Sequence, residues 1–94
     1  MKVNLYAMFD RTSSLHHAPF VSVNGEAAKR QMASTFARPG NQFYDFYEDY
    51  DLHHLGTFSD ETGIIEPAEK STCVCTGEEI AKQSELIKGR RTDE

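Results

Sequence analysis

Hydrophobic residues occupy every second position near the start of the chain, which is typical of a β-strand. One face of residues 3–9 carries Val3, Leu5, Ala7 and Phe9. We expect this face to point toward the hydrophobic core. Tyr6 and Met8 make the opposite face apolar as well, so the pattern predicts a strand that is well buried.

The stretch from Tyr50 to Gly63 predicts a second long strand that runs into a polar turn. Alternation places Leu52, His54, Gly56 and Phe58 on one face. It places Asp51, His53, Leu55 and Thr57 on the other face. Residues 59–63 are turn formers, and Gly63 is free to take a positive φ angle.

Shorter apolar runs predict further strands over residues 19–23, 64–66 and 71–75. The first of these begins with a proline, which suits an edge strand or a first position. Residues 10–14 are expected to form a polar turn, and His16-His17 to lie in a loop. Residues 67–70 begin with another proline, so we expect them to interrupt the strand pattern before residue 71.

A first helix is predicted over about residues 25–37, where apolar residues recur at helical spacing. Asn24 is a suitable N-cap because its side chain can accept a hydrogen bond from the first turn. The helix is expected to end before Pro39, which disfavours helical geometry in the residue before it. Residues 41–49 are rich in aromatic side chains, and both a short helix and a tight aromatic loop remain open there.

A second helix is predicted over about residues 77–88, where Thr76 and Glu79 have the spacing of a capping box. Gly89 is expected to close this helix, and residues 89–94 to form a flexible tail. The helices are separated by hairpins and do not alternate strictly with strands. This order favours an α+β fold, a small antiparallel sheet with two helices packed on one face.

The length of 94 residues favours a single domain over residues 1–94. Hydrophobic residues make up only 38% of the chain, so self-association or a partner could complete the fold. No apolar run reaches the roughly 20 residues that cross a bilayer, and the first residues lack the apolar region of a signal peptide. We therefore expect no membrane contact and a protein that stays where it is made. Its two cysteines are expected to be free thiols in a reducing cytosol.

The net charge of −5 argues against a protein whose main affinity comes from neutralising phosphates. A local basic patch remains compatible with this charge. The cations that could form one are Lys29, Arg30 and Arg38, with Lys88, Arg90 and Arg91 near the other end of the chain.

Cys73 and Cys75 fall on the same face of a predicted strand and could bind a metal together with His16-His17 or His53-His54. Zinc knuckles, however, separate their cysteines by two or more residues. We therefore interpret the two cysteines as small buried hydrophobic residues and predict no metal site. Neither a nucleophile elbow nor a phosphate-binding glycine loop is present, so we expect no catalytic residues, no enzyme activity and no cofactor.

A cluster of aromatic residues is the strongest compositional oddity: Phe43, Tyr44, Phe46, Tyr47 and Tyr50. Aromatic side chains can stack on unpaired bases, but here they alternate with carboxylates that repel phosphates. The cluster is therefore better interpreted as a cover for the core or as a dimer contact. A nucleic acid would fit better at Lys29, Arg30 and Arg38, with Tyr6 contributing from a strand.

The order of short motifs resembles that of the small nonstructural proteins of gokushoviruses, which are Microviridae bacteriophages with circular single-stranded DNA. The matching segments are residues 4–10, Pro19-Phe20, Asn24, Ala28, Arg30 and Phe36. They continue with residues 48–52, Gly56, Phe58, Asp60 and Thr62-Gly63. The resemblance covers roughly residues 3–66. It implies a phage protein made in the cytoplasm of the bacterial host, absent from the virion, and active in genome replication or in the switch to packaging.

Two hypotheses follow from the residues and the resemblance. The first is a nonenzymatic accessory protein that binds single-stranded DNA or phage or host replication proteins. In it, Lys29, Arg30 and Arg38 contact phosphates and Tyr6 or Tyr44 stacks on bases. The second is a protein-interaction module without affinity for nucleic acid. Its partner-binding surface would consist of Phe43, Phe46, Tyr47 and Tyr50.

Overall fold

The computed structural model describes residues 1–91, with residues 88–91 described by their backbone alone. Along this part of the chain the elements are β1 (Lys2–Asp10), β2 (Leu15–His16), β3 (Phe20–Ser22), α1 (Gly25–Phe36), α2 (Gln42–Asp45), the 3-10 turn η1 (Tyr47–Asp49), β4 (Tyr50–Ser59), β5 (Ile65–Thr76) and α3 (Gly77–Arg91). The predicted long strands and both predicted helices are present.

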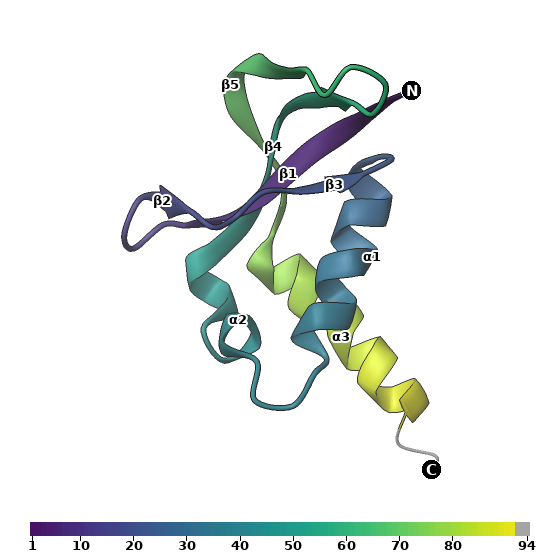
Figure 1. Ribbon diagram of the computed structural model, residues 1–94. Helices are drawn as coiled ribbons and strands as arrows, with labels where there is room; N and C mark the ends of the chain where they lie inside the picture. The colour runs from purple at the N-terminus through teal and green to yellow at the C-terminus, as the bar shows by residue number, and fades with distance from the viewer. Residues whose placement is uncertain (92–94) are drawn as a thin grey trace.

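The five strands form one antiparallel sheet with β1 and β4 at its centre. β2 and β3 pair with different parts of β1 along the same edge, and β5 forms the opposite edge beyond β4. Figure 1 shows α1 and α3 side by side on one side of the sheet, with α2 on that side as well. This arrangement confirms the predicted α+β class, with an antiparallel sheet and helices on one face.

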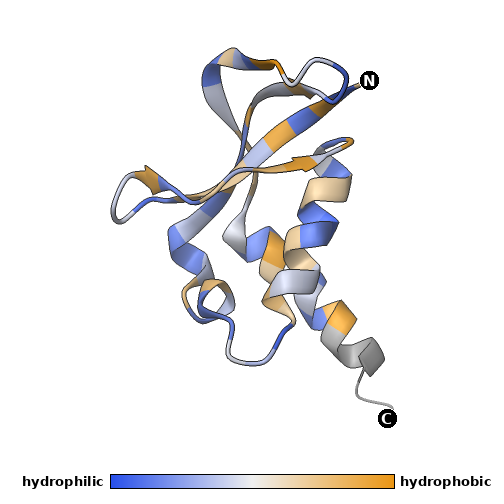
Figure 2. Cartoon of the chain, in the orientation of Figure 1, coloured by the Kyte–Doolittle hydropathy of each residue, from blue (hydrophilic) through white to orange (hydrophobic). Residues whose placement is uncertain are grey.

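The core lies between the sheet and the two long helices. β1, β4 and β5 contribute Tyr6, Met8, Leu52 and Cys75. The helices contribute Ala28, Met32, Ala33, Phe36, Ile80 and Ala81. Figure 2 shows both helices banded with hydrophobic and hydrophilic positions, as expected of helices that bury one face.

The prediction that the face of Leu5 and Phe9 would point to the core is wrong. Tyr6 and Met8 pack against the helices, whereas the Phe9 ring lies against His53, 4.9 Å between ring centroids, on the other face. We call this second face the open face, because the helices of the described chain lie on the opposite side of the sheet (Figure 1). Both faces of the strand are apolar, so alternation by itself does not say which one the helices cover.

A β-bulge at Leu55 changes the facing of residues along β4. Leu5 lies opposite Gly56, whereas the next residue, Tyr6, lies opposite His54. The extra residue shifts the alternation, so Leu52 faces the helices while Phe58, opposite Val3, lies on the open face. The predicted common face of Leu52, His54, Gly56 and Phe58 is therefore wrong beyond the bulge.

β5 is one strand, and the predicted break at residues 67–70 is wrong. Pro67 is tolerated because β5 is an edge strand, where a missing N–H breaks no ladder on the outer side. The register shifts between the pairs Gly56–Pro67 and His54–Thr72, so several residues of β5 face a single residue of β4. His16, expected in a loop, pairs with Phe9 in the two-residue strand β2.

Both helix starts follow the predicted chemistry. The Asn24 side chain accepts a hydrogen bond from the Ala27 N–H at 2.8 Å. The backbone N–H of Thr76 donates to Glu79 at 3.1 Å, and the N–H of Glu79 donates to the Thr76 hydroxyl at 3.2 Å. At its other end α3 continues to Arg91, past the expected stop at Gly89. The flexible tail stays a prediction, because residues 92–94 lie outside the described part of the chain.

Candidate functional site

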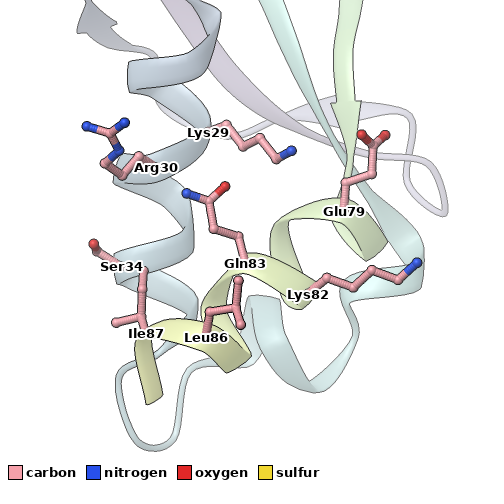
Figure 3. Close-up of a pocket in the computed structure, with 8 residues that line it drawn as sticks. All are labelled: Lys29, Arg30, Ser34, Glu79, Lys82, Gln83, Leu86 and Ile87. Atoms are coloured by element: carbon pink, nitrogen blue, oxygen red, sulfur yellow. The ribbon is translucent and has the colours of Figure 1, made fainter. Parts of the chain in front are cut away.

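A groove of about 790 Å³ runs between α1 and α3 on the outer surface of the helical layer. Its lining residues are Lys29, Arg30, Ser34, Glu79, Lys82, Gln83, Leu86 and Ile87. Figure 3 shows Lys29 and Gln83 reaching into the space between the two helices, with Arg30 and Lys82 flanking it on opposite sides. The groove exists because α1 and α3 pack side by side through their apolar stripes.

Of the side chains that the structure describes, three cations line the groove, in a chain whose net charge is −5. Lys29 and Arg30 come from α1, and Lys82 comes from the second turn of α3, where it also pairs with Glu78 at 3.9 Å. Among the side chains that the structure describes, Glu79 is the acid that lines the groove, and it is engaged by the capping box. The backbone N–H of Thr76 holds the pKa of Glu79 below its usual range, so this carboxylate is charged at neutral pH.

Apolar atoms lie beside the cations in the groove. The Leu86 side chain is 66% exposed, and Ile87 packs partly against the core. The Gln83 amide lies between them and Lys29 and offers both a donor and an acceptor (Figure 3). The arrangement combines phosphate-binding charge with an apolar surface and one neutral polar group.

The structure separates the other residues predicted for nucleic acid. Arg38 is exposed but lies beyond the end of α1, outside the groove lining. Tyr6 is only 3% exposed and packs in the core against Phe20 and His54, so its ring is not available for stacking on a base. The Tyr44 hydroxyl donates to Glu85, and its ring is next to Tyr47 on the other side of α3.

The aromatic segment is mostly a cover for the core. The Phe43 ring lies 6.1 Å from Phe36 and 5.0 Å from Tyr50, and Tyr47 packs against the same cluster. Phe46 differs, because 62% of it is exposed. Of the predicted partner-binding residues, Phe46 therefore presents the largest apolar surface to solvent.

A second cluster of polar side chains lies on the open face of the sheet. One ligand-type atom from each of Asp51, His53 and Cys73 falls within 4.8 Å of the others. Cys75 and His54 point to the opposite, helix-covered face. Burial lowers the pKa of His53 and raises the pKa of Cys73. The prediction of two buried cysteines holds for Cys75 but is wrong for Cys73, which is exposed.

A family model described as "Phage ORF5 protein" matches residues 3–80. The chain belongs to the phage ORF5 protein family. The match begins in β1 and ends in the first turn of α3, so it includes Lys29, Arg30 and the cluster on the open face. Searches of curated proteins and of solved structures gave no match to this chain. In the part of this phage protein that the structure describes, no helix is long and apolar enough to span a membrane.

Sequence reasoning missed Lys82, Gln83 and Leu86 as parts of the groove. All three lie beyond residue 80 on α3, outside the segment that the family model matches. The spacing of apolar residues along α3 predicts that it is a helix, but it does not predict which other helix α3 packs against. Only the packing of α3 against α1 brings Lys82 into the same groove as Lys29.

Proposed function

We propose that this phage ORF5 protein is a nonstructural, nonenzymatic accessory protein of the gokushovirus type that binds single-stranded DNA in the groove between α1 and α3. It would act in the cytoplasm of the bacterial host, in genome replication or in the switch to packaging. The observation that carries the proposal is that Lys29, Arg30 and Lys82 all line one groove of an acidic protein.

The groove chemistry suits an unpaired strand better than a duplex. Cations on both sides of the groove can follow a flexible phosphate backbone, and the exposed Leu86 offers an apolar contact for a base face. The acidic remainder of the protein repels phosphates and confines contact to this surface. The resemblance of residues 3–66 to proteins of single-stranded DNA phages supports the same class of ligand.

The proposal is tested by fluorescence anisotropy of a labelled single-stranded oligonucleotide at several salt concentrations, with a duplex control. We expect binding that weakens with salt and is lost in the double variant Lys29→Glu, Arg30→Glu. Lys82→Gln, which removes a single contact, should reduce the salt dependence of log K by about 0.7 per lost phosphate contact.

Lys70→Glu is the matched control, because Lys70 is exposed on β5, away from the groove. It reverses a charge without altering the proposed interface and should bind nearly as the parent protein does. Circular dichroism would check that every variant keeps its fold. If the control lost as much binding as the groove variants, the change in net charge alone would explain the loss. That result would contradict the proposal.

A protein-interaction module is the second candidate function, and the 62% exposure of Phe46 favours it. A pull-down from host lysate, with and without nuclease, distinguishes the two. A partner that is retained after nuclease treatment and lost in Phe46→Ala would support the second candidate. Absence of oligonucleotide binding at low salt would remove the first.

A further inference from the structure

The open face of the sheet holds three metal-binding types of side chain that the proposed DNA groove does not use. Asp51 and His53 come from β4, and Cys73 comes from β5. Their ligand-type atoms lie within 4.8 Å of one another. A carboxylate, an imidazole and a thiol at this separation can all reach one small cation.

The strand register creates this cluster. His53 lies opposite Cys73, while the next pair, Leu52 and Cys75, faces the core. Asp51 is two residues before His53 and therefore shares its face. The Ser71 hydroxyl lies 3.3 Å from Nδ1 of His53, a distance at which a hydrogen bond can fix the orientation of the ring.

A second observation concerns the carboxylate of Asp51. The Oδ1 atom of Asp51 is fully buried and makes no hydrogen bond with any residue that the structure describes. Its other oxygen, Oδ2, lies 3.3 Å from Nε of Arg11. A buried carboxylate oxygen without a partner is costly, and a bound cation is one way to satisfy it.

We propose that Asp51, His53 and Cys73 form a binding site for a zinc ion on the open face of the sheet. The mixed sulfur, nitrogen and oxygen donor set suits zinc, whereas magnesium and calcium prefer oxygen ligands alone. Zinc replaces the thiol proton of Cys73, which passes to water, and the bond formed is between zinc and the thiolate sulfur. This proposal differs from the expectation from the sequence that the protein binds no metal.

His16 is a candidate for a fourth ligand. Its ring lies 5.6 Å from the ring of His53, and both rings pack against Phe9 on the open face. The hairpin that carries His16 is exposed, so a small movement of β2 can bring its imidazole to the ion. A water molecule is the alternative ligand at that position.

Arg11 opposes the ion, because its guanidinium lies beside the same carboxylate that would bind zinc. The Arg11 side chain is 51% exposed, and its Nη2 also donates to the Glu48 carbonyl, so a divalent cation need displace only its contact with Asp51. Removing this positive charge should tighten zinc binding. This increase in zinc affinity follows specifically from the proposal that Asp51 is a ligand.

The experiment measures zinc binding by competition with a chromophoric chelator, under reducing conditions and without DNA. We expect one zinc ion per chain, with affinity reduced more than about tenfold in Cys73→Ala and in His53→Ala. Arg11→Gln should bind more tightly. Cys75→Ala and His54→Ala are the matched controls, because both residues face the helices, and each should bind as the parent does.

Cobalt(II) binding provides a spectroscopic signal that reports on the Cys73 ligand directly and is distinct from a loss of folding. The parent protein and Cys75→Ala should show a thiolate-to-cobalt charge-transfer band, and Cys73→Ala, folded by circular dichroism, should not. The absence of stoichiometric zinc binding would overturn the proposal. So would zinc binding that is unchanged in Cys73→Ala. Because no nucleic acid takes part, failure here leaves the DNA proposal as it stands.

Discussion

Gly56 on β4 lies directly against the backbone of Glu66 on β5. A Cβ atom at Gly56 would come within 2.2 Å of the Glu66 carbonyl oxygen and 2.9 Å of the Pro67 Cα. Both neighbours are backbone atoms that cannot turn away. The position follows the bulge at Leu55, which brings β4 close to the edge strand. Glycine is therefore required here by space as well as by its φ of +156°.

We expect Gly56→Ala to lower the free energy of unfolding by at least about 3 kcal/mol, because overpacking and backbone strain act together. Gly63→Ala is the matched control. Gly63 also has a positive φ, +75°, but a Cβ there would meet nothing within 4 Å. Gly63→Ala should lower the free energy of unfolding by about 1 kcal/mol. Urea denaturation of both variants measures the difference, and equal costs would contradict the close approach.

Phe36 and Phe46 are chemically identical and lie in opposite environments. Phe36 is 0% exposed in the core, and Phe46 is 62% exposed. Phe36→Ala should lower the free energy of unfolding by about 3–5 kcal/mol, and Phe46→Ala by about 0.5 kcal/mol or less. Denaturant titration measures both, with the milder Phe36→Leu as a second variant if Phe36→Ala does not fold. A large loss in Phe46→Ala would show that Phe46 packs against the core.

The capping box at the start of α3 predicts a pH-dependent effect. The Thr76 N–H lowers the folded-state pKa of Glu79, so its stabilisation is present above the unfolded-state pKa and is lost as pH falls through the folded-state pKa. Glu79→Gln should therefore be less stable than the parent at neutral pH. This difference should shrink as pH falls from neutral through the folded-state pKa, which lies below the ordinary value for glutamate. Thermal unfolding of both proteins across this range checks it, and a difference independent of pH would contradict the role of the charge.

The two thiols should react at very different rates. Cys75 is 6% exposed, and burial raises its pKa to about 12, so it holds almost no thiolate at neutral pH. Cys73 is exposed. Titration with a disulfide reagent should modify Cys73 in the folded protein, and Cys75 only after denaturant is added. Mass spectrometry of the modified peptide assigns the site, and modification of Cys75 in the native protein would contradict its burial.

Local chemistry made much of the fold predictable. The caps at Asn24 and Thr76 act within one helical turn, so their residues alone are enough to locate the helix starts. The strands at residues 3–9 and 50–58 were predicted correctly, because period-two alternation is a local property. The end of α3 was misplaced, because its helix continues through Gly89.

Tertiary structure decided which residues lie on each face of the sheet. The bulge at Leu55 depends on how β1 and β4 pair, and it moves Phe58 away from the face of Leu52. Tyr6, a candidate for base stacking, is a core residue because the helices cover its side of the sheet.

Tertiary structure also decided which residues come together in the groove between α1 and α3 and in the cluster on the open face. By itself the sequence determined the two long strands, the helix starts, the cations of α1 and the separate Cys and His pairs. Only the packing of α3 on α1 placed Lys82 in the lining of the same groove as Lys29, and only the pairing of β4 with β5 brought Cys73 beside His53. These contacts join residues far apart in the chain, and they depend on register and bulges that no local pattern specifies.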